Sequence, residues 1–396
     1  MFNYYRKTIM DLCEALNLIK NRPVTNMQLV YPLQVKLLKK IIQIEEKKNS
    51  KKLVLIELKK SFNVKQRLEK QIAMRNKNKL KKIIYMIDFY GHLIWVLKEI
   101  GDALVHIYLP SADIKTLANK EASGTIFDKA GYKLEKKLWT FAVKSGALAF
   151  VNDATNCLRH GDITLLKENK PILTMEIKSS KNKNARTSRQ YENLQSAISY
   201  LNKDNVIDGC ENYRRMLSNC EYKDNINLLN EVIHEAKLKY CCITRPVEEG
   251  LYYVENYGGI KNFDAQTQIM SHTKDEANLI ISHVNLFKFN NFGYYPFTLS
   301  IEDSAALVDF YAGELSILVV INISYIKKRL SLSEIEIEFI NGSIRVWTEE
   351  YEFYILPRYL EKIFIEFMSL ENFINEILWI SSNYSTVIKE GNMAVI

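Results

Sequence analysis

The sequence has few of the residues that break or cross-link a chain. Its 396 residues include only 14 Gly and 7 Pro, which excludes collagen-like and low-complexity scaffolds. The 6 Cys form no CxxC pair and no zinc-ligand spacing, so reduced and mostly buried thiols are expected. No apolar run approaches the roughly 18 residues that a membrane span needs, nor does the N-terminus carry the apolar stretch of a signal peptide. We therefore expect a cytoplasmic protein with no membrane partner.

Positive charge is concentrated at one end of the chain. The formal net charge is +8, but residues 1–82 contain 21 Lys or Arg against 6 Asp or Glu, whereas residues 301–376 contain 6 Lys or Arg against 14 Asp or Glu. A basic end is typical of nucleic-acid binding, because lysine and arginine neutralise phosphates. It is equally typical of a solvated helical surface, so charge alone does not separate these two interpretations.

The first part of the chain is expected to be helical. Residues 35–107 carry apolar side chains at helical spacing and predict two to four helices, with weak breaks at 48–50 and 75–78. The pattern changes around Pro110, where shorter and more varied segments begin.

After Pro110 the pattern predicts an α/β unit with an at least partly antiparallel sheet. A helix is expected at 128–144, with Leu134, Leu138 and Phe141 on its apolar side and Gly146 at its C-terminal cap. Further elements follow as three strands and a second helix, at 147–153, 161–167, 171–180 and 187–201.

The last part of the chain is expected to mix strands and helices. Residues 203–238 have a polar helical pattern, and Asn341-Gly342 predicts a tight hairpin because that dipeptide suits a turn with positive φ at both positions. The other expected elements are strands at 240–244, 251–254, 315–324, 334–339 and 343–347 and a final helix at 357–380.

The hairpin formed by 161–167 and 171–180 brings acidic residues together. Residues alternate between faces along a strand, so Glu176 and Lys178 share one face. With Glu168-Asn169-Lys170 as the loop, position i pairs with position 338 − i, which sets Asp162 opposite Glu176. Two carboxylates at such a short distance repel each other. A divalent cation such as Mg²⁺ relieves the repulsion because it prefers oxygen ligands. Such a cation activates a bound water and polarises a phosphate oxygen, with Lys178 orienting the water or offsetting charge on the phosphate.

Asp162 with Glu176-Ile177-Lys178, after a helix with Glu135 and before a helix with Gln190, resembles the PD-(D/E)xK nuclease superfamily over about residues 131–201. The resemblance implies a mixed sheet flanked by helices, as in restriction endonucleases, and hydrolysis of phosphodiester bonds with Mg²⁺, for which Mn²⁺ may substitute. It assigns Asp162, Glu176 and Glu135 to the metal, Lys178 to catalysis, and Gln190 to the catalytic surroundings. His160-Gly161 stands where the motif has its proline.

Two groups of basic residues are candidates for contact with nucleic acid. One group follows the motif and would hold phosphates beside the metal, and the other lies in the basic helical region; they are Lys181, Lys183, Arg186 and Arg189, and Lys77, Lys79, Lys81 and Lys82. Both groups are also compatible with solvated polar surface.

The sequence therefore predicts an α/β (mixed α+β) protein in three parts. These are a basic α-helical region at 1–110, a nuclease-like core at 111–255 with a helical insertion at 203–238, and an acidic α/β region at 256–396. The expected activity is metal-dependent cleavage of nucleic acid, DNA rather than RNA, and analogy favours phage defence or restriction. The alternative is a non-catalytic subunit on a nuclease-like fold that binds nucleic acid or a partner. The C-terminal region is a candidate surface for contact with a protein partner or with a second copy of the chain.

Overall fold

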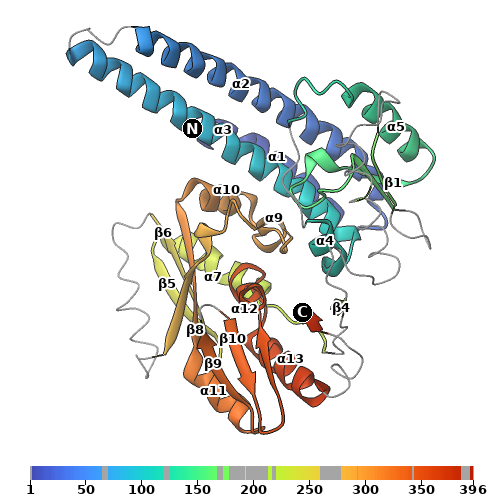
Figure 1. Ribbon diagram of the computed structural model, residues 1–396, viewed down its shortest axis with the longest axis vertical. Coiled ribbons are helices and arrows are strands. Elements are labelled where there is room, and N and C mark those ends of the chain that lie inside the picture. The colour runs from blue at the N-terminus through green and yellow to red at the C-terminus, as the bar shows by residue number, and fades with distance from the viewer. Residues whose placement is uncertain are drawn as a thin grey trace. The chain divides into compact units, whose positions relative to one another are not determined.

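The computed structural model describes residues 2–64, 70–118, 125–166, 173–177, 192, 213–215, 220–258, 278–291, 293–340, 343–384 and 393–395. They form a mixed α/β fold with two compact units (Figure 1). The N-terminal unit is Leu12–Leu194, and the C-terminal unit combines Met1–Asp11 with Gln195–Ile396. No helix in the described part of the chain is long and apolar enough to span a membrane.

Two long helices form most of the helical part of the N-terminal unit. α2 (Val30–Val64) and α3 (Lys70–Tyr108) pack against each other and lie side by side in Figure 1. The weak breaks predicted at 48–50 and 75–78 are wrong, because neither segment contains the Gly or Pro that interrupts a helix. α3 ends just before Leu109-Pro110, as the steric restriction on the residue before proline requires. α1 (Phe2–Asn21) precedes this pair and α4 (Ser111–Leu117) follows it.

The remaining elements of the N-terminal unit are one helix and one small sheet. α5 (Tyr132–Lys144) packs against the sheet of β1 (Leu148–Val151), β2 (Ile163–Leu166) and β3 (Leu173–Met175). The strand order is β1-β2-β3 and both pairings are antiparallel, which confirms the predicted partly antiparallel sheet. The predicted helix at 187–201 lies outside the described residues, apart from Glu192.

The described part of the C-terminal unit contains a four-stranded and a three-stranded antiparallel sheet. One has the order β5-β6-β8-β7, with α7 against β5 and β6 and α10 against β8, and the other has the order β11-β10-β9, with α11 against β9. The strands are β5 (Cys242–Glu248), β6 (Leu251–Tyr257), β7 (Leu279–His283), β8 (Leu315–Asn322), β9 (Glu336–Ile340), β10 (Ser343–Trp347) and β11 (Glu352–Ile355). The helices are α7 (Ile226–Lys239), α9 (Phe297–Ser300), α10 (Ser304–Ala312), α11 (Ile323–Ser331), α12 (Pro357–Ile365) and α13 (Leu370–Ser382). A short parallel pair, β4 (Tyr213–Arg215) and β12 (Met393–Val395), belongs to the same unit.

Several predictions for this unit are confirmed and two are wrong. The strands expected at 240–254 and 315–347 are present, and Ser343 pairs with Ile340 as a hairpin through Asn341-Gly342 requires. The single helix expected at 357–380 is two helices, because Phe367 adopts a positive φ of 55° and the Ser369 side chain caps the start of α13. Within 203–238, helix α7 confirms the helical pattern over its last part, whereas residues 213–215 form strand β4, which pairs with β12.

The two units do not follow the predicted boundaries at 110 and 255. α2 and α3 belong to the same unit as the hairpin that carries the candidate site. β6 runs across position 255 and pairs with β8, so no boundary falls there.

Candidate metal centre

Glu135 lies on the buried side of α5. The buried residues of this helix are Glu135, Trp139 and Ala142, at the spacing of one helical face. The apolar side predicted from Leu134, Leu138 and Phe141 is exposed, the three side chains being 37%, 39% and 70% accessible. The helix turns its less apolar face inward because Trp139 packs on Tyr31 and donates a hydrogen bond to the Ala149 carbonyl of β1. Glu135 is consequently only 2% exposed.

Asp162 lies at the start of β2, where β3 approaches closely. The pairs Ile163–Met175 and Leu165–Leu173 both follow the predicted 338 − i register, which is confirmed over the described ladder. Beyond it, the Asp162 amide donates to the Met175 carbonyl (2.7 Å), and the Ile177 amide donates to Asp162 Oδ2 (2.7 Å). Asp162 is therefore tied directly to the end of β3, next to Glu176.

Glycine is required at position 161 by this close approach. Gly161 has a φ of +71°, and a Cβ there would lie 2.7 Å from the Met175 carbonyl oxygen. This explains why the chain has His160-Gly161 where the nuclease motif has proline, whose φ is fixed near −65°.

Asp153 reaches the same place from the turn after β1. Its neighbour Asn152 donates to the His160 carbonyl (2.7 Å) and accepts from the Thr164 hydroxyl (2.9 Å), which joins this turn to β2. α3 holds the turn from the other side, since Asp102 accepts hydrogen bonds from the Asn156 and Cys157 amides. The segment that carries Asp153 is thus held by contacts with both β2 and α3.

Lys129 lies in the turn before α5. The two amides of Ile126 and Phe127 donate to the buried Glu45 carboxylate of α2, at 2.9 and 2.7 Å. The turn continues through hydrogen bonds from the Lys129 amide to Ile126 and from the Tyr132 amide to Lys129. Lys129 is therefore held on a turn with defined contacts to α2.

The carboxylates of Glu135, Asp153 and Asp162 meet around Lys129. One oxygen from each of the three lies within 4.8 Å of the others. Lys129 Nζ is 2.9 Å from Glu135 Oε1, 2.7 Å from Asp153 Oδ2 and 2.8 Å from Asp162 Oδ1. The acid side chains are only 3%, 11% and 12% exposed. We call these three residues the acid triad.

The electrostatics of the acid triad favour a cation. Burial raises the pKa of Glu135, the hydrogen bond from Lys129 lowers it, and the charge of Asp162 raises it further, with a net rise. Burial lowers the pKa of Lys129, but the charges and hydrogen bonds of Asp153 and Asp162 outweigh burial and raise it above its ordinary value. Oxygen atoms from three separate elements, partly shielded from water, form the type of ligand set that Mg²⁺ and Mn²⁺ take.

Two of the three predicted metal ligands, Glu135 and Asp162, lie in the acid triad. The third, Glu176, is half-buried at the end of β3 beside the Asp162 contact, and it is not one of the three acids that the described residues bring within 4.8 Å. Lys178, Gln190 and the basic residues Lys181, Lys183, Arg186 and Arg189 lie outside the described residues. On α3, Lys77, Lys79, Lys81 and Lys82 are all exposed.

Asp153 and Lys129 were not predicted from the sequence as site residues. Asp153 had one usable signal, because an acid at the last position of a predicted strand, here 147–153, lies at the same edge of the sheet as the start of the next antiparallel strand. Lys129 had none, since its place depends on the contact between Glu45 and the turn that contains it.

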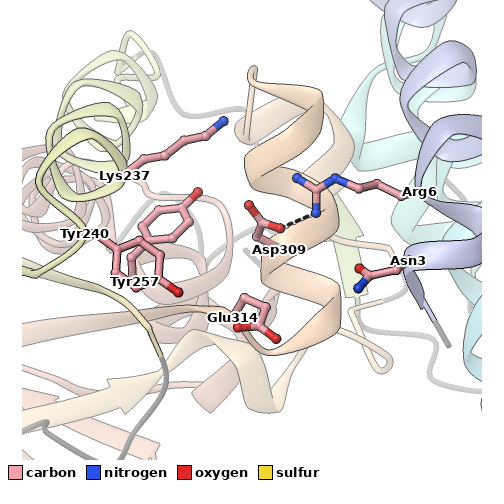
Figure 2. Close-up of a pocket in the computed structure, with 7 residues that line it drawn as sticks. All are labelled: Asn3, Arg6, Lys237, Tyr240, Tyr257, Asp309 and Glu314. Carbon is pink, nitrogen blue, oxygen red and sulfur yellow. Dashed lines mark hydrogen bonds and ion pairs between the residues drawn. The ribbon is translucent and has the colours of Figure 1, made fainter.

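A separate pocket of about 420 Å³ lies in the C-terminal unit (Figure 2). Its cations are already matched, because Arg6 forms an ion pair with Asp309 and Lys237 forms one with Asp303. None of the site residues predicted from sequence lines it.

Comparison with known proteins returned no match: neither a protein-family model, nor a curated protein, nor a solved structure is significantly similar to the chain. The acid triad and its surroundings are therefore the basis for a functional proposal.

Proposed function

We propose that the protein is a metal-dependent nuclease whose cation is held by the acid triad. The observation that carries this proposal is the meeting of Glu135, Asp153 and Asp162 at one end of the β2–β3 hairpin. Two of these acids were assigned to a metal from the sequence motif alone.

In this proposal the acid triad holds Mg²⁺ or Mn²⁺ through carboxylate oxygens and leaves other positions of the metal for water and phosphate. A cation bound there would lower the pKa of a bound water and polarise a phosphate oxygen. Glu176 directly precedes Ile177, whose amide donates to Asp162, and we expect its carboxylate to extend the ligand set; Lys178 follows it by two residues.

The proposed substrate is nucleic acid, with DNA preferred. α2 and α3 belong to the same unit as the acid triad, and their exposed lysines Lys77, Lys79, Lys81 and Lys82 offer contacts to a phosphate backbone. A role in phage defence or restriction remains an analogy with the family that the motif resembles.

The direct test is incubation of the purified chain with plasmid DNA, linear DNA and RNA in Mg²⁺, Mn²⁺ or EDTA. We expect cleavage with either metal and none with EDTA. Comparison of circular with linear DNA separates internal from terminal cleavage. Failure to cleave any of the three substrates with either metal would contradict the proposal.

One observation favours the alternative, a non-catalytic subunit that binds nucleic acid or a protein. Lys129 already contacts all three acids, so the acid triad also has the composition of a structural ion-pair cluster. A chain that binds DNA with a steep salt dependence, but does not cleave it, would support this alternative.

Nucleic-acid binding by α3 is tested by changing Lys77, Lys79, Lys81 and Lys82 together to Glu. For every phosphate that the variant no longer neutralises, the slope of log affinity against log salt should fall by about 0.9 on duplex DNA, so binding should weaken and the slope should flatten. The measurement is fluorescence anisotropy over a salt series in an Asp162→Asn background with EDTA present, so that cleavage does not obscure binding. The matched control reverses Lys133, Lys136 and Lys137 of α5, which are also exposed or half-exposed. An unchanged affinity and slope would show that the α3 lysines are solvated surface.

A further inference from the structure

Lys129 takes the place that a bound metal would need. Its ammonium lies 2.7–2.9 Å from one oxygen of each acid in the triad. A metal bound to those same oxygens at about 2.0–2.1 Å would overlap with the ammonium and be repelled by its charge. Lys129 and the metal therefore cannot occupy the acid triad together.

A single ammonium leaves the acid triad incompletely satisfied. Three carboxylates face one positive charge at hydrogen-bonding distance. Glu135 is 2% exposed, yet its Oε2 has no hydrogen-bond partner among the described residues, while its Oε1 contacts Lys129. The buried Lys98 of α3 also interacts electrostatically with Asp153, but it is shared with Glu45 and Asp102. A buried carboxylate oxygen without a partner is costly, and a divalent cation offers both the second charge and the missing contact.

The side chain of Lys129 is able to move out of the acid triad into water. Its side chain is 28% exposed, more than any member of the acid triad, so the ammonium can reach water by side-chain rotation. The backbone of its turn is fixed by Glu45, whose two hydrogen bonds go to Ile126 and Phe127 and not to Lys129. The side chain can therefore move while the turn stays in place.

We propose that Lys129 is a displaceable internal cation, which holds the acid triad together without metal and leaves it when a divalent cation binds. This inference rests on the proposed function for the identity of the competing cation. Lys129 then sets the metal affinity, because binding must displace its three contacts.

The test compares the full-length chain with Lys129→Met, which keeps the length of the side chain but removes its charge. Lys136→Met is the control, since Lys136 is exposed on the neighbouring α5. Mn²⁺ binding is measured from the EPR signal of unbound Mn²⁺. We expect Lys129→Met to bind Mn²⁺ at least about 10-fold more tightly than the unaltered chain, and Lys136→Met to bind it equally well. Equal or weaker binding by Lys129→Met would overturn the inference.

A second measurement uses only the unaltered chain and so does not depend on whether the variant folds. Lysines are labelled with an amine-reactive ester, and the modification of Lys129 is followed by mass spectrometry with and without Mn²⁺. We expect slow labelling without metal and at least about fivefold faster labelling with it, relative to Lys136. An unchanged rate at saturating Mn²⁺ would show that Lys129 stays in the acid triad and would also overturn the inference.

These outcomes separate this inference from the proposed function. Tighter Mn²⁺ binding by Lys129→Met, with no cleavage of any nucleic acid, would support Lys129 as a displaceable cation and contradict the proposed nuclease activity. Cleavage of nucleic acid, with equal Mn²⁺ binding by the unaltered chain and Lys129→Met, would support the nuclease activity and contradict the displacement of Lys129. If neither chain binds Mn²⁺, both proposals fail.

Discussion

Asp162→Asn is expected to reduce metal-dependent cleavage by about 100-fold or more while the chain stays folded. Asp162 is the acid that joins the two parts of the site: Oδ1 contacts Lys129 in the acid triad, and Oδ2 accepts from the Ile177 amide beside Glu176. Asparagine can keep the contact with Ile177 through its carbonyl oxygen. Its NH₂ group then faces the cation, where it is neither a ligand nor negatively charged. The substitution therefore removes the metal contact with little change of shape.

The measurement is the initial rate of plasmid cleavage in Mg²⁺ and Mn²⁺, together with thermal unfolding to confirm the fold. Asp128→Asn is the matched control, because Asp128 is an exposed carboxylate next to Lys129 and asparagine tolerates its positive φ of 62°. We expect the control to cleave at the unaltered rate. A folded Asp162→Asn protein with full activity would show that the metal is bound elsewhere or that the activity belongs to another site.

The second large effect concerns stability and lies in the C-terminal unit. Glu255 is on β6, between Ile243 of β5 and Ile317 of β8, and it is 0% exposed. Neither of its carboxylate oxygens has a hydrogen-bond partner among the described residues. Burial raises the pKa of Glu255 well above its ordinary value, and the charge of Arg245 only partly opposes this.

The raised pKa makes stability depend on pH in a definite direction. Above the unfolded pKa of about 4.3, the unfolded chain loses the Glu255 proton while the folded chain still holds it. This contribution to the free energy of unfolding is therefore present at low pH and is lost as the pH rises toward the folded pKa. Glu255→Gln removes the dependence, and Glu255→Met also removes the unpaired polar atoms.

We expect Glu255→Met to raise the free energy of unfolding at pH 7 by about 1–3 kcal/mol. Urea unfolding at pH 5 and pH 7, with hydrogen exchange of β6 and β8 peptides, measures the change and locates it. The increase in the free energy of unfolding should be smaller at pH 5 than at pH 7, because a larger fraction of Glu255 is protonated in the unfolded wild-type chain at pH 5. Glu249→Gln, an exposed residue in the β5–β6 turn, is the control and should leave stability unchanged at both values. Destabilisation by Glu255→Met at pH 7 would mean that Glu255 makes a favourable contact in the folded protein.

The local pattern of the sequence was sufficient for the elements with regular periodicity. The register of the β2–β3 hairpin followed from alternation and a three-residue loop, and Leu37 and Ile41 of α2 are fully buried as their spacing predicts. The hairpin at Asn341-Gly342 followed from turn chemistry. In each case residues near in sequence determine the structure.

The parts that could not be predicted depend on contacts between distant residues. α5 buries Glu135 instead of Leu134 and Phe141, because Trp139 packs on Tyr31 of α2, and helical periodicity alone cannot show this partner. Asp153 and Lys129 join the site through α3 and α2, which supply Asp102 and Glu45 from distant parts of the sequence. The helices predicted as a nucleic-acid-binding region thus also build the candidate site.

Crystals of the full chain grown or soaked with Mn²⁺ show whether the acid triad binds a divalent cation, because Mn²⁺ is located by its anomalous scattering. We expect an anomalous peak about 2.1 Å from carboxylate oxygens of Glu135, Asp153 and Asp162, with Lys129 Nζ moved out of the acid triad. An acid triad that still holds Lys129, with no peak beside it at saturating Mn²⁺, would instead identify the cluster as a structural ion pair.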